Sequence, residues 1–183
     1  MSIHDPRLAT SPASLEVPPF SWRARHRRKK EETLLVHEAE WALEQAQLQT
    51  LLSDARHLVE ENWIRGAWFA VRDDSGRTRL VRGGRAIMLS DSRITGSCVV
   101  GSIIRASGGD ANTHEHVVQK ALDAVWHALR QPEDSKVRWC PSPMTRVQHL
   151  RDLTRWNDHE AKSADEVSSL LLTAERVVLF AEE

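Results

Sequence analysis

The sequence predicts an α+β fold that is mainly α, with about five helices and a small antiparallel hairpin or three-stranded sheet within residues 67–90. Apolar residues recur every three or four positions along most of the chain, which is the period of a helix with one buried face. One stretch instead alternates with period two around Asp73-Asp74-Ser75-Gly76, which is typical of a hairpin. The 183 residues can bury a core without disulfides or metals.

The N-terminal part of the chain differs from the rest in charge. Residues 1–30 carry seven basic and two acidic residues, a net +5, whereas the remaining residues carry 18 basic and 24 acidic ones, a net −6. Prolines interrupt residues 1–21, which have no apolar period. We therefore expect a disordered basic tail over residues 1–32 and a single globular, mainly helical domain over residues 33–183.

A basic cluster follows Trp22 and consists of Arg23, Arg25, Arg27, Arg28, Lys29 and Lys30. Such a cluster predicts a salt-dependent contact with nucleic-acid phosphates. The alternative is a solvated helix entrance whose charge is compensated by Glu31 and Glu32. Short basic runs have many false matches, so both interpretations stay open.

A helical pattern extends from Thr33 to Asn62, as one helix or as two with a break near Gln49 and Thr50. Its apolar face is formed by Trp41, Leu48, Leu52, Ala55 and Val59. Gly66 is a plausible stop. Strands are then expected at 68–71 and 77–81, with a third strand at 85–89.

Residues 95–109 predict a helix of small and apolar residues, which Thr95 or Ser97 would cap and Gly108 or Gly109 would end. Gly101 inside this helix indicates that another element packs closely against it. Cys98 lies near the helix start, where the helix dipole can lower a thiol pKa. The alternative is that Cys98 is a small buried hydrophobe.

Two further helices are expected, at 114–130 and 144–153. The first would bury Val117, Ala121, Ala124, Val125 and Leu129. The second would direct Met144, Val147, Leu150 and Leu153 inward. His114 and His116 point about 200° apart on a helix, so we expect no shared metal ion.

The last helix has the clearest start in the chain. Ser163 and Glu166 form a capping-box pattern in which each side chain bonds the backbone N–H of the other residue. The apolar period then continues from Val167, although the apolar run at 177–180 also fits a short strand. Before the cap, the turn Trp156-Asn157-Asp158 is expected to be structural, with Trp156 in the core and Trp63 as a second structural tryptophan.

Two functional hypotheses follow from these residues. The favoured one is a non-enzymatic binding or regulatory module, because no phosphate-binding loop, His-Glu-x-x-His, Cys-x-x-Cys or Gly-x-Ser-x-Gly motif occurs. The alternative is a hydrolase or transferase with Cys98 as nucleophile. Its base would be one of His114, His116 and His149, and its orienting residue would be Asn157 or Asp158.

The remaining expectations concern partners and compartment. We expect no cofactor and no metal, and the partner would be an unidentified protein or nucleic acid. Two separate cysteines and no signal peptide favour a cytoplasmic protein, and no apolar run is long enough to span a membrane. The sequence does not indicate an oligomeric state.

Taken together, the motifs resemble an uncharacterised family of small actinobacterial domains. The resemblance covers about residues 45–175, and it implies a cytoplasmic, mainly helical domain with no established activity. This chain departs from the family in its basic N-terminal tail, in a longer segment between Trp68 and Ile94, and at Ser102, where alanine is usual. The residues that carry the resemblance are Glu61–Gly66, Gly96–Gly101 with Ile103 and Ala106, Trp156–Asp158, and Ser163–Val167 with Leu170 and Leu171.

Overall fold

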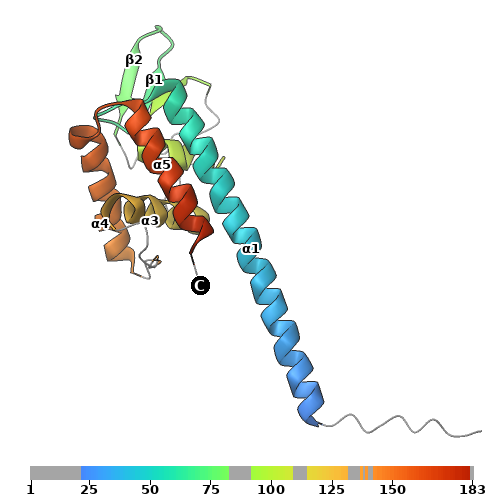
Figure 1. The fold of residues 1–183 in the computed structure, drawn as a ribbon. Helices are drawn as coiled ribbons and strands as arrows, with labels where there is room; N and C mark the ends of the chain where they lie inside the picture. Colours follow the sequence, from blue (N-terminus) through green and yellow to red (C-terminus); the bar gives the residue numbers. More distant parts are fainter. Residues whose placement is uncertain are drawn as a thin grey trace, which may run out of the picture. The chain divides into compact units, whose positions relative to one another are not determined.

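The computed structural model describes residues 22–82, 92–108, 115–131, 137, 139 and 142–181. The chain divides into two compact units, Met1–Glu38 and Ala39–Glu183, and each is described by itself. Helix α1 (Trp22–Asn62) supplies the described residues of the first unit and the first element of the second (Figure 1).

The first unit is helical from Trp22 onward, so α1 begins earlier than the expected start at Thr33. Residues 22–32 are therefore helical and do not belong to a disordered tail, which corrects the expectation for them, and residues 1–21 lie outside the described part. Arginine and lysine favour helices nearly as well as alanine does, which the expectation of disorder overlooked. The Trp22 ring packs edge-on against His26, one turn further along, with ring centroids 4.8 Å apart.

The second unit confirms the expected α+β, mainly helical fold. Its sheet consists of β1 (Phe69–Arg72), β2 (Thr78–Val81) and β3 (Ile94–Ser97). Its helices after α1 are α2 (Val99–Ala106), α3 (His116–Arg130), α4 (Pro143–Arg155), the π-helical turn η1 (Trp156–Glu160) and α5 (Ala164–Leu179). None of the helices in the described ranges is long and apolar enough to cross a membrane.

The sheet is antiparallel in the order β2-β1-β3, and Ala70 in its centre lies opposite Leu80 and Gly96. The hairpin expected around residues 73–76 is confirmed, and Asp73 closes it by accepting hydrogen bonds from Ser75 and from the Arg77 N–H. The third described strand is β3, because residues 94–97 extend the sheet before α2 begins. The strand expected at 85–89 lies outside the described residues.

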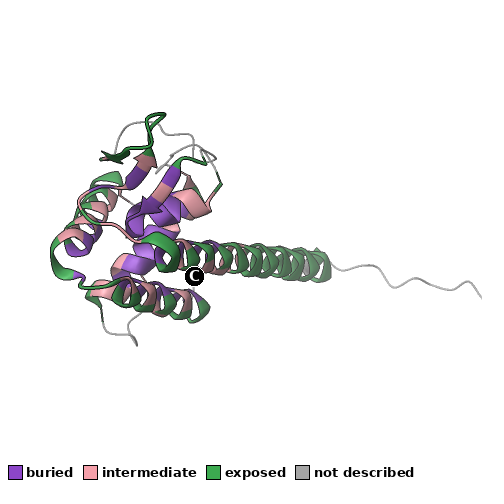
Figure 2. Cartoon of the chain, turned by 90° about the horizontal axis from the view of Figure 1, so that it is seen from above, coloured by how far each residue is buried: buried purple, intermediate pink, exposed green. Residues whose placement is uncertain are grey.

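The core of the second unit lies between its helices and one face of the sheet (Figure 2). Helix α3 packs against both α5 and α4. Fully buried side chains come from different elements, among them Leu52 of α1, Phe69 of β1, Val100 of α2, Val125 of α3 and Leu171 of α5. Helix α1 continues through Gln49 and Thr50, so the break considered there does not occur.

Helix α4 buries only part of the face that was expected: Leu153 is in the core and Leu150 packs against it. Met144 is 78 % exposed and Val147 is 43 % exposed, whereas His149 and Leu153 are buried. The expected series used steps of three residues only. Each such step turns about 300°, so the series drifts around the helix by about 60° per step, and only its last two members reach the core.

Helix α5 begins and ends close to where it was expected. The Glu166 N–H donates to the Ser163 hydroxyl at 3.3 Å, which confirms the cap. The Glu166 carboxylate, however, accepts from the N–H of Lys162 rather than from that of Ser163. At the other end the helix continues to Leu179, so no strand forms at 177–180, and the Gln45 amide of α1 donates to the Val178 and Ala181 carbonyls.

The start of α2 is a point of close approach between helix and sheet. A Cβ atom on Gly101 would lie 2.2 Å from the Trp68 carbonyl oxygen and 3.1 Å from the Phe69 ring. The close packing expected at Gly101 is therefore present, and its partner is the beginning of β1. Helix α2 begins only at Val99, because residues 94–97 form β3 and Cys98 is the N-cap.

We predict that Gly101→Ala destabilises the domain by about 2 kcal/mol or more, since overpacking against backbone outweighs the roughly 1 kcal/mol that alanine gains inside a helix. Urea denaturation would measure the change. Gly76→Ala is the matched control, because Gly76 has a positive φ but no atom within 4 Å of an added Cβ, and it should cost only about 1 kcal/mol. A stability gain in Gly101→Ala would contradict the close approach.

Candidate functional site

The centre of the candidate site is the buried amide of Asn157. Its Oδ1 accepts hydrogen bonds from the Trp63 indole N–H at 2.8 Å and from the Val99 N–H at 3.1 Å. Its Nδ2 donates to the Ile64 carbonyl at 3.2 Å and to the Asp158 carboxylate at 2.9 Å. The side chain thus joins the end of α1, the start of α2 and the turn after α4.

The local backbone explains why Asn157 points inward. Helix α4 passes directly into η1, and the Ala161 N–H donates to the Trp156 carbonyl five residues earlier, at 2.9 Å. Such a π-turn inserts one extra residue and turns the side chains that follow relative to the preceding helix. Trp156 and Asn157 of this turn are buried, whereas His159 and Glu160 are exposed.

A groove opens beside this amide, with a volume of about 710 Å³. We call it the Arg65–Arg82 groove. Its lining consists of Arg65, Gly66, Ala67, Trp68, Arg82, Thr154, Asp158 and His159. Among the described residues, the ionisable lining groups are two arginines, one histidine and one carboxylate, and they come from the segment after α1, the end of β2 and η1.

Backbone carbonyls hold both arginines of the groove. Arg65 donates to the Ala161 carbonyl and its guanidinium lies over the Trp63 ring, 4.9 Å from the centroid. Arg82 donates through Nε to the Gly66 carbonyl at 2.9 Å. Asp158 accepts from the Gly66 N–H at 2.8 Å through Oδ1, the oxygen that also accepts from Asn157.

Cys98 adjoins this site but is closed off from solvent. It is 1 % exposed, and its Sγ accepts a hydrogen bond from the Gly101 N–H at 3.4 Å. Burial raises the pKa of the thiol to about 12, the nearby Asp158 charge adds to this increase, and the N–H groups of Gly101 and Val100 oppose it. A thiol with this pKa is protonated at neutral pH, which argues against a nucleophilic role.

The histidines considered as catalytic bases pair with other residues. His116 is exposed and its Nε2 lies 3.1 Å from Glu44 of α1. His149 is buried, and its Nδ1 lies 2.9 Å from Asp123 of α3. His114 lies outside the described residues. No hydrogen bond joins Cys98 to a histidine within the described ranges, so the structure brings Asn157 and Asp158 near Cys98 without a base.

Two polar clusters were missed by the sequence analysis. In the first, the His149 ring stacks on Trp126 with centroids 3.9 Å apart, and the Trp126 indole donates to Asp152. In the second, the Lys120 ammonium bonds Glu44 at 2.5 Å and lies over the rings of Trp41 and Trp139. Both link residues that are far apart in sequence, so no local pattern could identify them.

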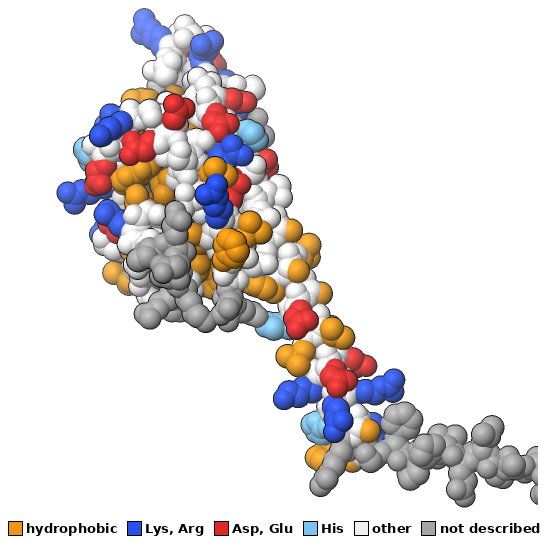
Figure 3. Space-filling model, viewed as in Figure 1, with side chains coloured by type: hydrophobic (Ala, Val, Ile, Leu, Met, Phe, Trp, Pro, Cys, Tyr) orange, Lys and Arg blue, Asp and Glu red, His pale blue; other side chains and the backbone are white. Residues whose placement is uncertain are grey.

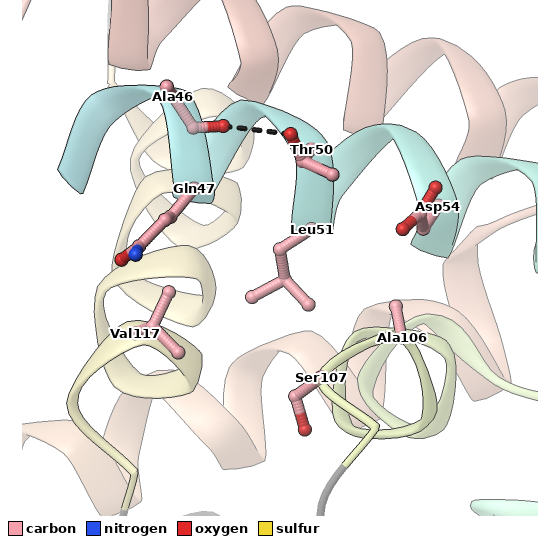
Figure 4. A pocket seen from close by; sticks show the side chains of 8 residues that line it. All are labelled: Ala46, Gln47, Thr50, Leu51, Asp54, Ala106, Ser107 and Val117. Atoms are coloured by element: carbon pink, nitrogen blue, oxygen red, sulfur yellow. Dashed lines mark hydrogen bonds between the residues drawn. The ribbon is translucent and has the colours of Figure 1, made fainter. Parts of the chain in front are cut away.

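A second cavity, of about 490 Å³, lies between α1, α2 and α3 (Figure 4). Its lining is largely apolar or small. The Thr50 hydroxyl in it bonds the Ala46 carbonyl of its own helix, and Asp54 is the only ionisable lining residue in the described part of the chain. This cavity offers no group of side chains comparable to the Arg65–Arg82 groove. Nowhere in the described ranges do three His, Cys, Asp or Glu side chains gather as metal ligands.

The basic cluster is on the first turns of α1, where Lys and Arg side chains gather along the helix (Figure 3). Arg25, Arg27, Arg28, Lys29 and Lys30 are all exposed. The side chain of Arg23 lies outside the described part, although its backbone is helical. The cluster is in the first compact unit, whereas all lining residues of the Arg65–Arg82 groove given above are in the second.

Comparison with known proteins identifies a family without assigning a function. Residues 43–177 match the model of a family of unknown function (DUF6197). This match spans most of the chain, so the chain belongs to that family, in agreement with the resemblance to an uncharacterised family. No curated protein and no solved structure matches the chain. The actinobacterial origin stays a prediction.

We predict that Asn157→Ala destabilises the domain by about 3 kcal/mol or more, because two buried N–H donors and one carbonyl lose their partner. Urea denaturation followed by tryptophan fluorescence would measure the change. Gln148→Ala, which removes only an exposed bond to Asp152, is the control and should change stability by about 0.5 kcal/mol or less. Equal effects of the two substitutions would contradict the central role of Asn157.

We predict that Cys98 in the folded protein does not react with iodoacetamide at pH 7–9 over hours, because its thiol is buried and protonated. The experiment uses a Cys140→Ser variant, so that Cys98 is the sole thiol, and mass spectrometry counts the adducts. In denaturing urea the same thiol should label within minutes. Rapid labelling of the folded protein would restore Cys98 as a candidate nucleophile.

Proposed function

We propose that this protein is a non-enzymatic binding or regulatory module that contacts double-stranded DNA through the basic cluster at the start of α1. The observation that carries the proposal is that Arg25, Arg27, Lys29 and Lys30 are exposed on consecutive turns of one helix. An ordered helix presents these cations in a fixed spatial pattern, which a disordered tail cannot do.

The spacing of the cations supports a helix placed in a groove. Positions 25 and 29 lie one turn apart on one side of the helix, while 27 and 30 lie on another side. The major groove of B-DNA admits an α-helix and has a phosphate strand on each side. Cations on two sides of one helix match that arrangement. The deep, narrow major groove of double-stranded RNA does not admit a helix, which favours DNA.

The surroundings of Cys98 support the non-enzymatic half of the proposal. A nucleophilic cysteine needs access to substrate and a thiolate at working pH. Cys98 is buried, its pKa is raised to about 12, and its recorded hydrogen bond comes from a backbone N–H. No observation favours the hydrolase or transferase as a second candidate.

We predict that the full-length protein shifts a 20-base-pair duplex in a mobility assay and that binding weakens with salt. Changing Arg25, Arg27, Lys29 and Lys30 together to Gln should lower the affinity at least about a hundredfold at low salt. If all four side chains contact phosphates, the slope of log K against log salt should become less negative by about 3–4, because each neutralised phosphate contributes about −0.9 to it. Circular dichroism would verify that the variant is folded.

The matched control removes the same number of charges from the second unit. Arg130, Arg151, Arg155 and Lys162 are exposed there, and changing them to Gln should leave the salt slope unchanged. If both quadruple variants lost the same affinity for the duplex, the binding would depend on the net charge of the protein and not on the basic cluster. Absence of any shift with the full-length protein at low salt would contradict the proposal.

A further inference from the structure

We infer that the Arg65–Arg82 groove binds a nucleoside phosphate, with the phosphate at the two guanidinium groups and the base against Trp68 and Asp158. This site lies within the part of the chain that matches the family model, residues 43–177. It shares no residue with the basic cluster of α1, so it does not depend on the proposed contact with DNA.

The two arginines provide the anion end of the site. Each is held by one backbone carbonyl, at Ala161 and at Gly66, which restricts the position of the guanidinium. Within the described residues, neither arginine forms an ion pair with a carboxylate. A guanidinium has five N–H donors in a planar fork that matches phosphate oxygens. Two guanidinium groups that line one groove, each held by a carbonyl and neither paired with a described carboxylate, can therefore offer N–H donors to a phosphate.

The opposite polarity of Asp158 restricts the ligand further. Its Oδ1 already accepts two N–H groups, from Gly66 and Asn157, whereas Oδ2 accepts no hydrogen bond from the described residues. A simple anion would gain nothing from this carboxylate and would be repelled by it. A ligand that also offers an N–H donor would instead form a hydrogen bond with Oδ2 of Asp158, and nucleobases have such donors on their edges.

Trp68 supplies a surface for the flat part of the ligand. It lines the groove and is half-buried, so part of the side chain is exposed. Bases stack on aromatic side chains in nucleotide-binding proteins. The groove volume of about 710 Å³ falls within the range of about 300–1,000 Å³ that is usual for small-molecule sites. Cationic, aromatic and carboxylate groups together match a nucleoside phosphate better than inorganic phosphate.

Isothermal titration of the full chain tests this inference, with the four ribonucleoside 5′-monophosphates as probes. The probe with the best match is guanosine 5′-monophosphate, whose base offers two adjacent N–H donors. Ribose 5-phosphate and inorganic phosphate lack the base, and guanosine lacks the phosphate. At least one monophosphate should bind about tenfold more tightly than each of these three compounds. Absence of binding by all four at millimolar concentration, or equal binding of ribose 5-phosphate, would overturn the inference.

Two variants assign the ends of the site. Arg82→Gln should weaken monophosphate binding at least about tenfold, because one charge-assisted contact is lost. Asp158→Asn retains an acceptor for the Gly66 N–H but can replace Oδ2 by a donor. The Asp158→Asn substitution should lower the affinity for the nucleotide at least about tenfold. The affinity for ribose 5-phosphate should stay unchanged or increase. An equal loss for both ligands would overturn the assignment of the base end.

Arg151→Gln is the matched control, since Arg151 is an exposed arginine of α4 outside the groove lining, and it should bind like the unmodified protein. Thermal unfolding of each variant would separate lost binding from lost folding. The quadruple variant of the basic cluster should retain full nucleotide affinity. If nucleotide binding disappeared in that variant and persisted in Arg82→Gln, the ligand would lie on the basic cluster and the groove assignment would be wrong.

Discussion

The second unit depends on one buried amide group. Asn157 joins Trp63 and Ile64, which follow α1, to Val99 at the start of α2, and three of its four hydrogen bonds connect segments that the chain brings together only on folding. Leaving a buried amide without hydrogen-bond partners costs more free energy of folding than a formed hydrogen bond contributes. The amide therefore fixes the relative positions of these segments, where an apolar side chain would allow them to slide.

A second constraint acts beside the first. Gly101 lets α2 approach the Trp68 carbonyl, and Gly96 lets β3 approach Ile64 and the Asn62 carbonyl. These contacts and the Asn157 bonds hold the start of α2 close to the sheet. Cys98, at this start, is buried as a consequence. A helix N-terminus lowers a thiol pKa, but exclusion of water has the larger effect here and leaves the pKa of Cys98 at about 12.

Ionisable side chains of the second unit differ in whether they are paired with an opposite charge. His149 with Asp123, and Lys120 with Glu44, are paired at or near the interior, where an unpaired charge is costly. Arg65 and Arg82 instead bond backbone carbonyls and have no carboxylate partner within the described residues. The guanidinium groups of this groove are therefore not neutralised by a described carboxylate, whereas the paired clusters are largely satisfied by their own contacts.

The sequence by itself determined the features that depend on local chemistry. Helical periods, the Asp73 hairpin and the Ser163 cap all rest on interactions within a few residues, and they are found in the structure. The tertiary structure decided which residues meet. Only folding joined Asn157 to Trp63 and Val99, buried Cys98 without a hydrogen bond to a histidine of the described residues, and brought Arg65 and Arg82 to the lining of one groove. These contacts join positions up to 94 residues apart, and no local period or spacing encodes such a distance.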